Sequence, residues 1–130
     1  MKVVRFQDLD CWKASRELVV LVFTACRHGE LTKDFETRSQ LRRAATSAMN
    51  NIAEGFARFS TKDSIKFYDI AQSSAAEVES MTYILSDLQY LPHETIAMIA
   101  SKALETKNRT LGLIRYLRRR DTGTRGDKSA

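Results

Sequence analysis

The sequence predicts a single all-α domain, an up-and-down four-helix bundle. Breakers of helices are few, since the 130 residues include one proline and five glycines, and Ala, Leu, Glu, Lys and Arg are abundant. Apolar residues recur at intervals of three and four in four long stretches that are joined by short connections. Short connections make consecutive helices antiparallel neighbours. With 43% hydrophobic residues the chain can supply the core of one domain.

The first helix is predicted over Cys11–Arg27, with Asp8 or Asp10 as its N-cap and Gly29 at its end. Residues 18–23 within it are apolar around the whole circumference. A peripheral helix of a monomeric bundle would show a polar side at this point. The first helix is therefore expected either to be central or to be covered by another subunit.

The second helix follows a polar connection over residues 29–33, and Thr32 or Asp34 is its predicted N-cap. It is predicted to end near Arg58. One face of it is narrow and apolar, with mostly small side chains. The opposite face, which we call the polar stripe, carries hydrogen-bonding and charged residues at helical spacing: Arg43, Ser47, Asn51, Glu54 and Arg58.

The third helix is predicted from Ser60, which forms a capping box with Asp63, to about Leu91. A core seam alternates steps of four and three: Phe67, Ala71, Ser74, Val78, Met81, Leu85 and Leu88. A second row repeats every seven residues: Ile70, Glu77, Ile84 and Leu91. Glu77 takes an apolar position in that row, so we expect it to be partly buried and paired with Arg43 or Arg42.

The fourth helix begins at Pro92, which is tolerated in a first turn, and ends in the arginine cluster Arg115, Arg118, Arg119 and Arg120. The bundle therefore spans residues 1–120, and residues 121–130 are predicted to form a disordered basic tail. The arginine cluster has two interpretations. It is either a solvated helix face or a phosphate-binding surface, which guanidinium geometry favours.

The sequence offers no motif for catalysis, metal binding or cofactor binding. It has no Cys/His cluster with metal-ligand spacing, no Gly-rich phosphate loop and no serine-nucleophile motif. Glu54 and Glu77 are conceivable as paired carboxylates, but nearby arginines make ion pairing their expected role. Cys11 and Cys26 are expected to be buried thiols. The longest apolar run is far shorter than the roughly 20 residues of a membrane span, so we expect a cytoplasmic protein without a membrane partner.

Three segments together resemble a known family: Trp12-Lys13-Ala14, then Gln40-Leu41-Arg42-Arg43-Ala44-Ala45 with Ser47, and Asn51-Ile52-Ala53-Glu54-Gly55. They are similar to the bacterial four-helix-bundle proteins encoded within intervening sequences of 23S ribosomal RNA genes. Accessory proteins of diversity-generating retroelements are more distant relatives. The resemblance covers about Phe6–Leu91. It places the family's signature positions on Arg42, Arg43, Ser47, Asn51, Glu54, Gly55, Ser74 and Glu77.

The resemblance implies a closed bundle that assembles into a homopentamer without known catalytic activity. It also implies a nucleic-acid-binding role, and the retroelement relatives contact a reverse transcriptase. The chain departs from the family pattern in two places. Glu36-Thr37 stand where the family has Gly-Leu, and Met49-Asn50 stand where it has Pro-Ser. The second departure removes a potential kink from the signature helix, which affects the packing angle there.

Two function hypotheses follow. In the first, a non-enzymatic ring binds structured RNA or other nucleic acid through phosphates, mainly with the arginine cluster and the tail. In the second, the ring is a scaffold that docks a partner protein such as a nucleic-acid enzyme. For the polar stripe, a network between helices or subunits is the favoured role, and contact with nucleic acid is the alternative.

Overall fold

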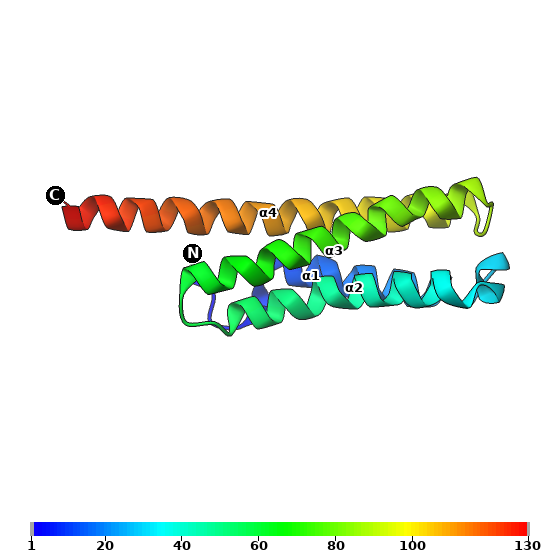
Figure 1. The fold of residues 1–130 in the computed structure, drawn as a ribbon, viewed down its shortest axis with the longest axis horizontal. Coiled ribbons are helices and arrows are strands. Elements are labelled where there is room, and N and C mark those ends of the chain that lie inside the picture. Colours follow the sequence, from blue (N-terminus) through cyan, green and yellow to red (C-terminus); the bar gives the residue numbers. More distant parts are fainter. Residues whose placement is uncertain (1, 130) are drawn as a thin grey trace.

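The computed structural model describes residues 2–129, with side chains described as far as Asp121. Its helices are α1 (Asp10–Ala25), α2 (Phe35–Phe56), α3 (Thr61–Asp87) and α4 (His93–Ser129), with short 3-10 helices η1 (Phe6–Asp8) and η2 (Glu30–Lys33). No strand occurs between residues 2 and 129. The predicted all-α four-helix bundle is confirmed. Figure 1 shows the long α4 lying along α3 and extending beyond the other helices at its C-terminal end.

The helices follow one another around the bundle in chain order. α1 packs against α2 and α4, and α3 packs against the same two helices. α1 is therefore one of four walls, and the expectation of a central helix is wrong. Its apolar segment has an outer side instead, where the side chain of Val20 is 59% exposed and that of Phe23 40%. Cover from another subunit stays a prediction.

The core consists of two apolar clusters, one toward each end of the bundle. The cluster at the α1–α2 connection contains Leu18, Leu31, Leu41, Leu85 and Ile99 among its fully buried side chains. The cluster at the other end surrounds Ile52, Tyr68 and Ile114 and includes Cys11. Both cysteines are buried and free, as predicted. Burial raises the pKa of the Cys11 thiol to about 11, so the group stays protonated and unreactive at neutral pH.

Two of the three predicted helix caps are confirmed. The Asp34 carboxylate accepts hydrogen bonds from the Thr37 N–H at 3.1 Å and the Thr37 hydroxyl at 2.7 Å, and the Ser60 hydroxyl accepts one from the Asp63 N–H at 3.1 Å. The first cap is wrong, because Leu9 occupies the N-cap position of α1 without a side-chain hydrogen bond. Asp10 is instead the first residue of the helix, where its charge still favours the dipole.

The buried face of α3 is rotated from the predicted seam. The buried residues of α3 are Tyr68, Ala71, Ala75, Val78, Met81, Thr82 and Leu85. The predicted seam is therefore right at four positions and misses the other three. Leu88 is 54% exposed, because α3 already ends at Asp87. The second row is wrong at three of its four positions, since Ile70, Glu77 and Ile84 are exposed along the flank of the helix, and only Leu91, beyond the end of α3, is buried.

The helix α4 continues to Ser129, so the arginine cluster lies within the helix, and the boundary between bundle and tail at residue 120 stays a prediction. The predicted disordered tail, residues 121–130, falls on this last part of the chain. Its side chains from residue 122 onward lie outside the described residues, and its behaviour in solution stays a prediction. None of the helices in the described part of the chain is long and apolar enough to cross a membrane.

Candidate nucleic-acid interface

The arginine cluster is exposed on α4 and divides into two parts. All four guanidinium groups belong to exposed residues. Arg115, Arg118 and Arg119 are three and four positions apart, so they are neighbours on one helix face. Arg120 turns toward the first turn of α3, where its Nη2 donates to the Thr61 hydroxyl at 3.3 Å. The structure thus brings three of the four predicted residues together on one outer face.

The stretch of α4 that leads to this cluster is purely basic. Residues 106–120 contain six Lys or Arg and no Asp or Glu. Two of the six are neutralised by other helices, because Lys107 pairs with Glu79 at 3.2 Å and Arg109 with Asp10 at 3.6 Å. Arg115 and Arg119 form no ion pair with the side chains that the structure describes. This end of α4 therefore carries net positive charge that can attract phosphates.

Aromatic side chains lie beside the cluster at the same end of the bundle. A hollow of about 200 Å3 is lined by Arg58, Phe59, Thr61, Tyr116 and Arg120 among other residues. Phe59 and Tyr116 are exposed, so their rings are accessible to a ligand. Surfaces that bind both the backbone and the unpaired bases of a nucleic acid typically combine cations with exposed aromatic rings.

The polar stripe of α2 forms a hydrogen-bonded network with α3. The hydroxyls of Ser47 and Ser74 lie 2.8 Å apart. The Asn51 side-chain amide donates to the Ser47 carbonyl at 2.9 Å and to the Ser47 hydroxyl at 3.1 Å. Glu54 and Arg58 form the predicted pair at 4.0 Å, and the Arg58 guanidinium lies 4.3 Å from the centre of the Phe67 ring. The predicted network between helices is therefore confirmed for these residues.

The predicted pair of Glu77 with Arg43 or Arg42 is wrong. Glu77 is exposed and accepts a hydrogen bond from the Gln40 amide at 3.2 Å. Arg42 lies over the Phe23 ring, 5.9 Å from its centre, on the side of α2 that faces α1. Arg43 is exposed and forms no ion pair among the described side chains. The physical reason is the rotation of α3, which places Glu77 on the flank in water, where a carboxylate needs no buried partner.

Because Glu77 is exposed, its substitution should have only a small effect on stability. Glu77→Ala should change the free energy of unfolding by no more than about 0.5 kcal/mol, as is usual for surface substitutions. Chemical denaturation of the variant and the parent would measure the difference. A loss of several times that size would contradict the exposed position and show that Glu77 has a buried partner.

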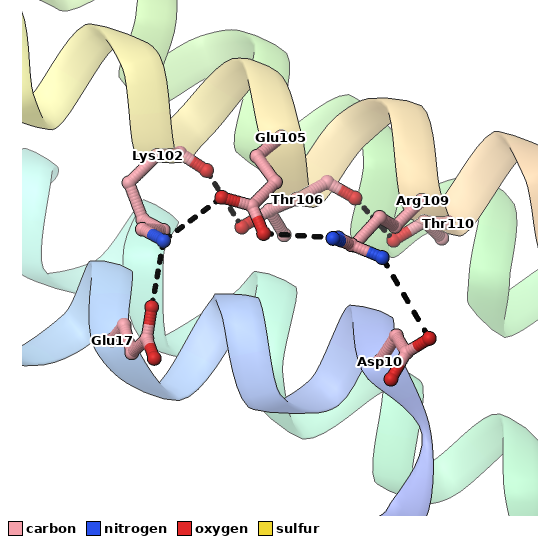
Figure 2. Close-up of polar contacts among 7 residues, drawn as sticks. All are labelled: Asp10, Glu17, Lys102, Glu105, Thr106, Arg109 and Thr110. Carbon is pink, nitrogen blue, oxygen red and sulfur yellow. Dashed lines mark hydrogen bonds and ion pairs between the residues drawn. The ribbon is translucent and has the colours of Figure 1, made fainter.

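A ladder of charges joins α1 to α4, and the sequence analysis missed it. Glu17 contacts Lys102 at 2.6 Å, Lys102 contacts Glu105 at 2.8 Å, and Glu105 contacts Arg109 at 2.9 Å. Arg109 then reaches Asp10 at the start of α1, and Figure 2 shows the ladder running along both helices. The sequence does contain a pattern that indicates such a ladder. Basic and acidic residues alternate three and four positions apart on α4, and two acidic residues lie seven positions apart on α1.

Two fully buried threonines of α4 lie next to this ladder of charges. Thr106 donates to the Lys102 carbonyl at 2.9 Å, and Thr110 donates to the Thr106 carbonyl at 2.7 Å. Their hydroxyls are thus satisfied within α4. The pKa of Lys102 is raised by its contacts with Glu105 and Glu17, and the pKa of Glu105 is lowered by Lys102 and Arg109. The ladder therefore links α1 to α4 through ion pairs along the surface of the bundle.

Two carboxylates have lowered pKa values in the folded protein, and they should make its stability depend on pH. Hydrogen bonds from Thr37 and the Tyr90 hydroxyl lower the pKa of Asp34, and the pKa of Glu105 is also lowered. Protons therefore bind more tightly to the unfolded chain, so stability is constant near neutral pH and falls as the pH drops through about 4 and below. Thermal unfolding from pH 7 to pH 3 would show this fall.

The matching variant keeps the hydrogen-bonding shape and removes both charges. In Asp34→Asn/Glu105→Gln we expect lower stability at pH 7 and a flatter decline toward acid than in the parent. Asp87→Asn, an exposed carboxylate at the end of α3, serves as the control and should retain the parental profile. An unchanged decline in the double variant would assign acid sensitivity to other carboxylates.

The comparisons with known proteins identify the family. The family model described as 23S rRNA-intervening sequence protein matches residues 7–112. The chain belongs to the 23S rRNA-intervening sequence protein family. The resemblance stated from the sequence is thereby confirmed. The match ends before Arg115, so the arginine cluster of this family member lies beyond the matched residues.

A solved structure supports the same fold. A protein of unknown function from the S23 ribosomal protein family of Bacteroides thetaiotaomicron matches with a TM-score of 0.72 and 23% identity. The match covers 80% of this chain and 97% of that chain. No curated protein matches the chain. The comparisons thus establish the family and the bundle fold.

Proposed function

We propose that this family member is a non-enzymatic, homo-oligomeric cytoplasmic protein that binds structured RNA or other nucleic acid through arginine–phosphate contacts. The observation that carries the proposal is the outer face of α4, where Arg115, Arg118 and Arg119 are exposed neighbours. Guanidinium groups bind phosphate oxygens in pairs and keep their charge at any physiological pH. Such contacts recognise the nucleic-acid backbone and carry no sequence information themselves.

Self-association is part of the proposal, because the flank of α3 carries unpaired apolar side chains. Ile70 and Ile84 are exposed there. Apolar side chains in such rows are typical of association surfaces. The family resemblance suggests a pentamer. Copies of the arginine face in one assembly would raise the affinity for a long nucleic acid by multivalency.

The second candidate function is a scaffold that docks a partner protein without direct contact to nucleic acid. The same exposed apolar side chains favour it, since they would fit another protein, for example a nucleic-acid enzyme, as well as a second copy. In that case the arginines would serve solubility or assembly.

Titration of labelled nucleic acid with purified protein separates the two functions. Fluorescence anisotropy would be recorded for a structured RNA and for a duplex DNA of random sequence, each at low and at physiological salt. The proposal predicts binding to both at low salt, and a preference for the RNA would support the link to ribosomal RNA. Absence of binding to either at low salt would reject the proposal and favour the scaffold.

A further inference from the structure

A groove beside α1 combines cations with the one tryptophan of the chain. It has a volume of about 810 Å3, is open to solvent and runs between α1 and the first half of α4. Its apolar lining includes Val20, Leu21 and Met98. This volume is in the range of small-molecule sites. The groove lies away from the arginine cluster, which follows later on α4.

The groove is positively charged. Its charged lining residues are Arg5, Lys13, Arg16, Glu17 and Lys102. Glu17 forms an ion pair with Lys102 at 2.6 Å, and Arg5 forms one with Asp8 at 3.6 Å. Lys13 and Arg16 are exposed and form no ion pair among the described side chains. The two unpaired cations can therefore attract an anionic ligand such as a phosphate group.

Trp12 gives the groove a flat apolar surface that is held in place. The edge of Phe6 packs against the indole, with ring centres 5.2 Å apart and planes at 66°. The Arg16 guanidinium lies over the indole, 5.8 Å from the ring centre. Trp12 is partly exposed. An aromatic ring with an arginine over it is a surface on which a nucleobase stacks, because both the ring and the guanidinium are planar.

We propose that this groove binds a single-stranded segment of nucleic acid, with a base stacked on the platform of Trp12 and Arg16 and a phosphate beside Lys13. A duplex keeps its bases paired and stacked inside, so it cannot offer one to the platform. An acidic peptide would satisfy the cations but would leave the platform and the apolar lining without a matching group. The inference goes beyond the proposed function, since it concerns bases and does not depend on the arginine cluster.

Intrinsic fluorescence tests the inference directly, because Trp12 is the only tryptophan. The full-length protein would be titrated with an eight-nucleotide oligothymidine, with an abasic phosphodiester of the same length and with inorganic phosphate. We expect saturable quenching by the oligothymidine. The abasic strand should bind at least about fivefold more weakly, since stacking of one base on an aromatic ring is worth about 1–3 kcal/mol. Inorganic phosphate should leave the emission unchanged.

Two variants locate the site. Lys13→Ala retains the platform and should weaken quenching several-fold, and Arg16→Ala should weaken it further. Lys62→Ala, which removes an exposed cation of α3, is the matched control and should behave like the parent. Three results would each overturn the inference. The abasic strand could bind with equal affinity, the double variant Lys13→Ala/Arg16→Ala could still be quenched, or the oligothymidine could leave the emission of the parent unchanged.

The same measurements keep this inference separate from the proposed function. Arg115→Ala/Arg119→Ala should reduce the anisotropy signal with structured RNA and leave the quenching of Trp12 by the oligothymidine intact. If the oligothymidine quenches Trp12 but the structured RNA does not bind, the proposed role of the arginine face is rejected and the inference about the groove stands. Binding of structured RNA without quenching would reject the groove alone and would fit a groove covered by a second copy of the chain.

Discussion

Gly55→Ala is expected to lower the free energy of unfolding by about 1–2 kcal/mol, although alanine is the better helix former. A Cβ atom at position 55 would lie 2.6 Å and 2.8 Å from two carbons of the Tyr68 ring and 3.1 Å from the Ser64 carbonyl oxygen. The Tyr68 ring is buried, so any movement of the ring disturbs the packing around it. Either the ring or the α3 backbone has to move, which separates α2 from α3.

Gly112→Ala is the matched control for this prediction. Gly112 also lies within a helix, but a Cβ atom there would meet no other atom within 4 Å. Alanine should therefore raise stability by about 0.5–1 kcal/mol through its helix preference alone. Urea denaturation of both variants would compare the two glycines. If both substitutions stabilise the protein, the close approach of α2 and α3 at Gly55 is wrong.

Arg115→Ala/Arg119→Ala is expected to weaken binding of structured RNA and of duplex DNA about tenfold or more at low salt. Both side chains are exposed and four positions apart, so their loss removes two phosphate contacts per subunit without touching the core. The effect should be similar for different sequences, because phosphate contacts carry no base information. Arg120 is left unchanged, since it contacts Thr61 on α3.

The control removes the same charge from the opposite end of the bundle. Arg27 and Lys33 are exposed in the α1–α2 connection, far from the C-terminal end of α4 in Figure 1. Arg27→Ala/Lys33→Ala lowers the net charge equally and should retain most of the affinity. Equal losses in the two double variants would mean that overall charge, and no particular face, attracts the nucleic acid. Unfolding curves of both variants should match the parent.

Local hydrogen-bonding chemistry made much of the fold predictable. The caps Asp34 and Ser60 follow from side chains that accept bonds from the next turn. The contact of Asn51 with Ser47 follows from their spacing of four. The exposure of the arginine cluster was equally predictable, because long runs of arginine are rarely buried. These features depend on neighbours within one helix, and the sequence contains that information.

The rotation of α3 was not predictable from spacing alone. Its apolar residues recur at three and four on adjacent rows, so the pattern fits more than one buried face. The choice is made by tertiary packing, where Tyr68 fits against Gly55 and fills the space that the missing side chain leaves. Glu77 consequently lies on the flank with Gln40. A prediction of that contact needs the angle of one helix relative to another.

The same reason explains the missed contacts between α1 and α4. The ladder from Glu17 to Asp10 and the groove at Trp12 both require the register of two helices that are distant in sequence. Spacing within one helix shows which side chains share a face. It does not show which face of another helix lies opposite. The contact of Trp12 with Arg16 follows from their spacing of four within α1, but the groove that they line together with α4 could be found only from the fold.

The salt dependence of RNA binding tests the central claim most directly. Affinity for a structured RNA would be measured by anisotropy at several salt concentrations for the parent and for Arg115→Ala/Arg119→Ala. The account predicts a steep linear fall of log affinity with log salt in the parent, and a slope in the variant that is shallower by about 1–2 for each subunit in contact. Binding that is insensitive to salt, or an identical slope in the variant, would contradict a phosphate-binding arginine face.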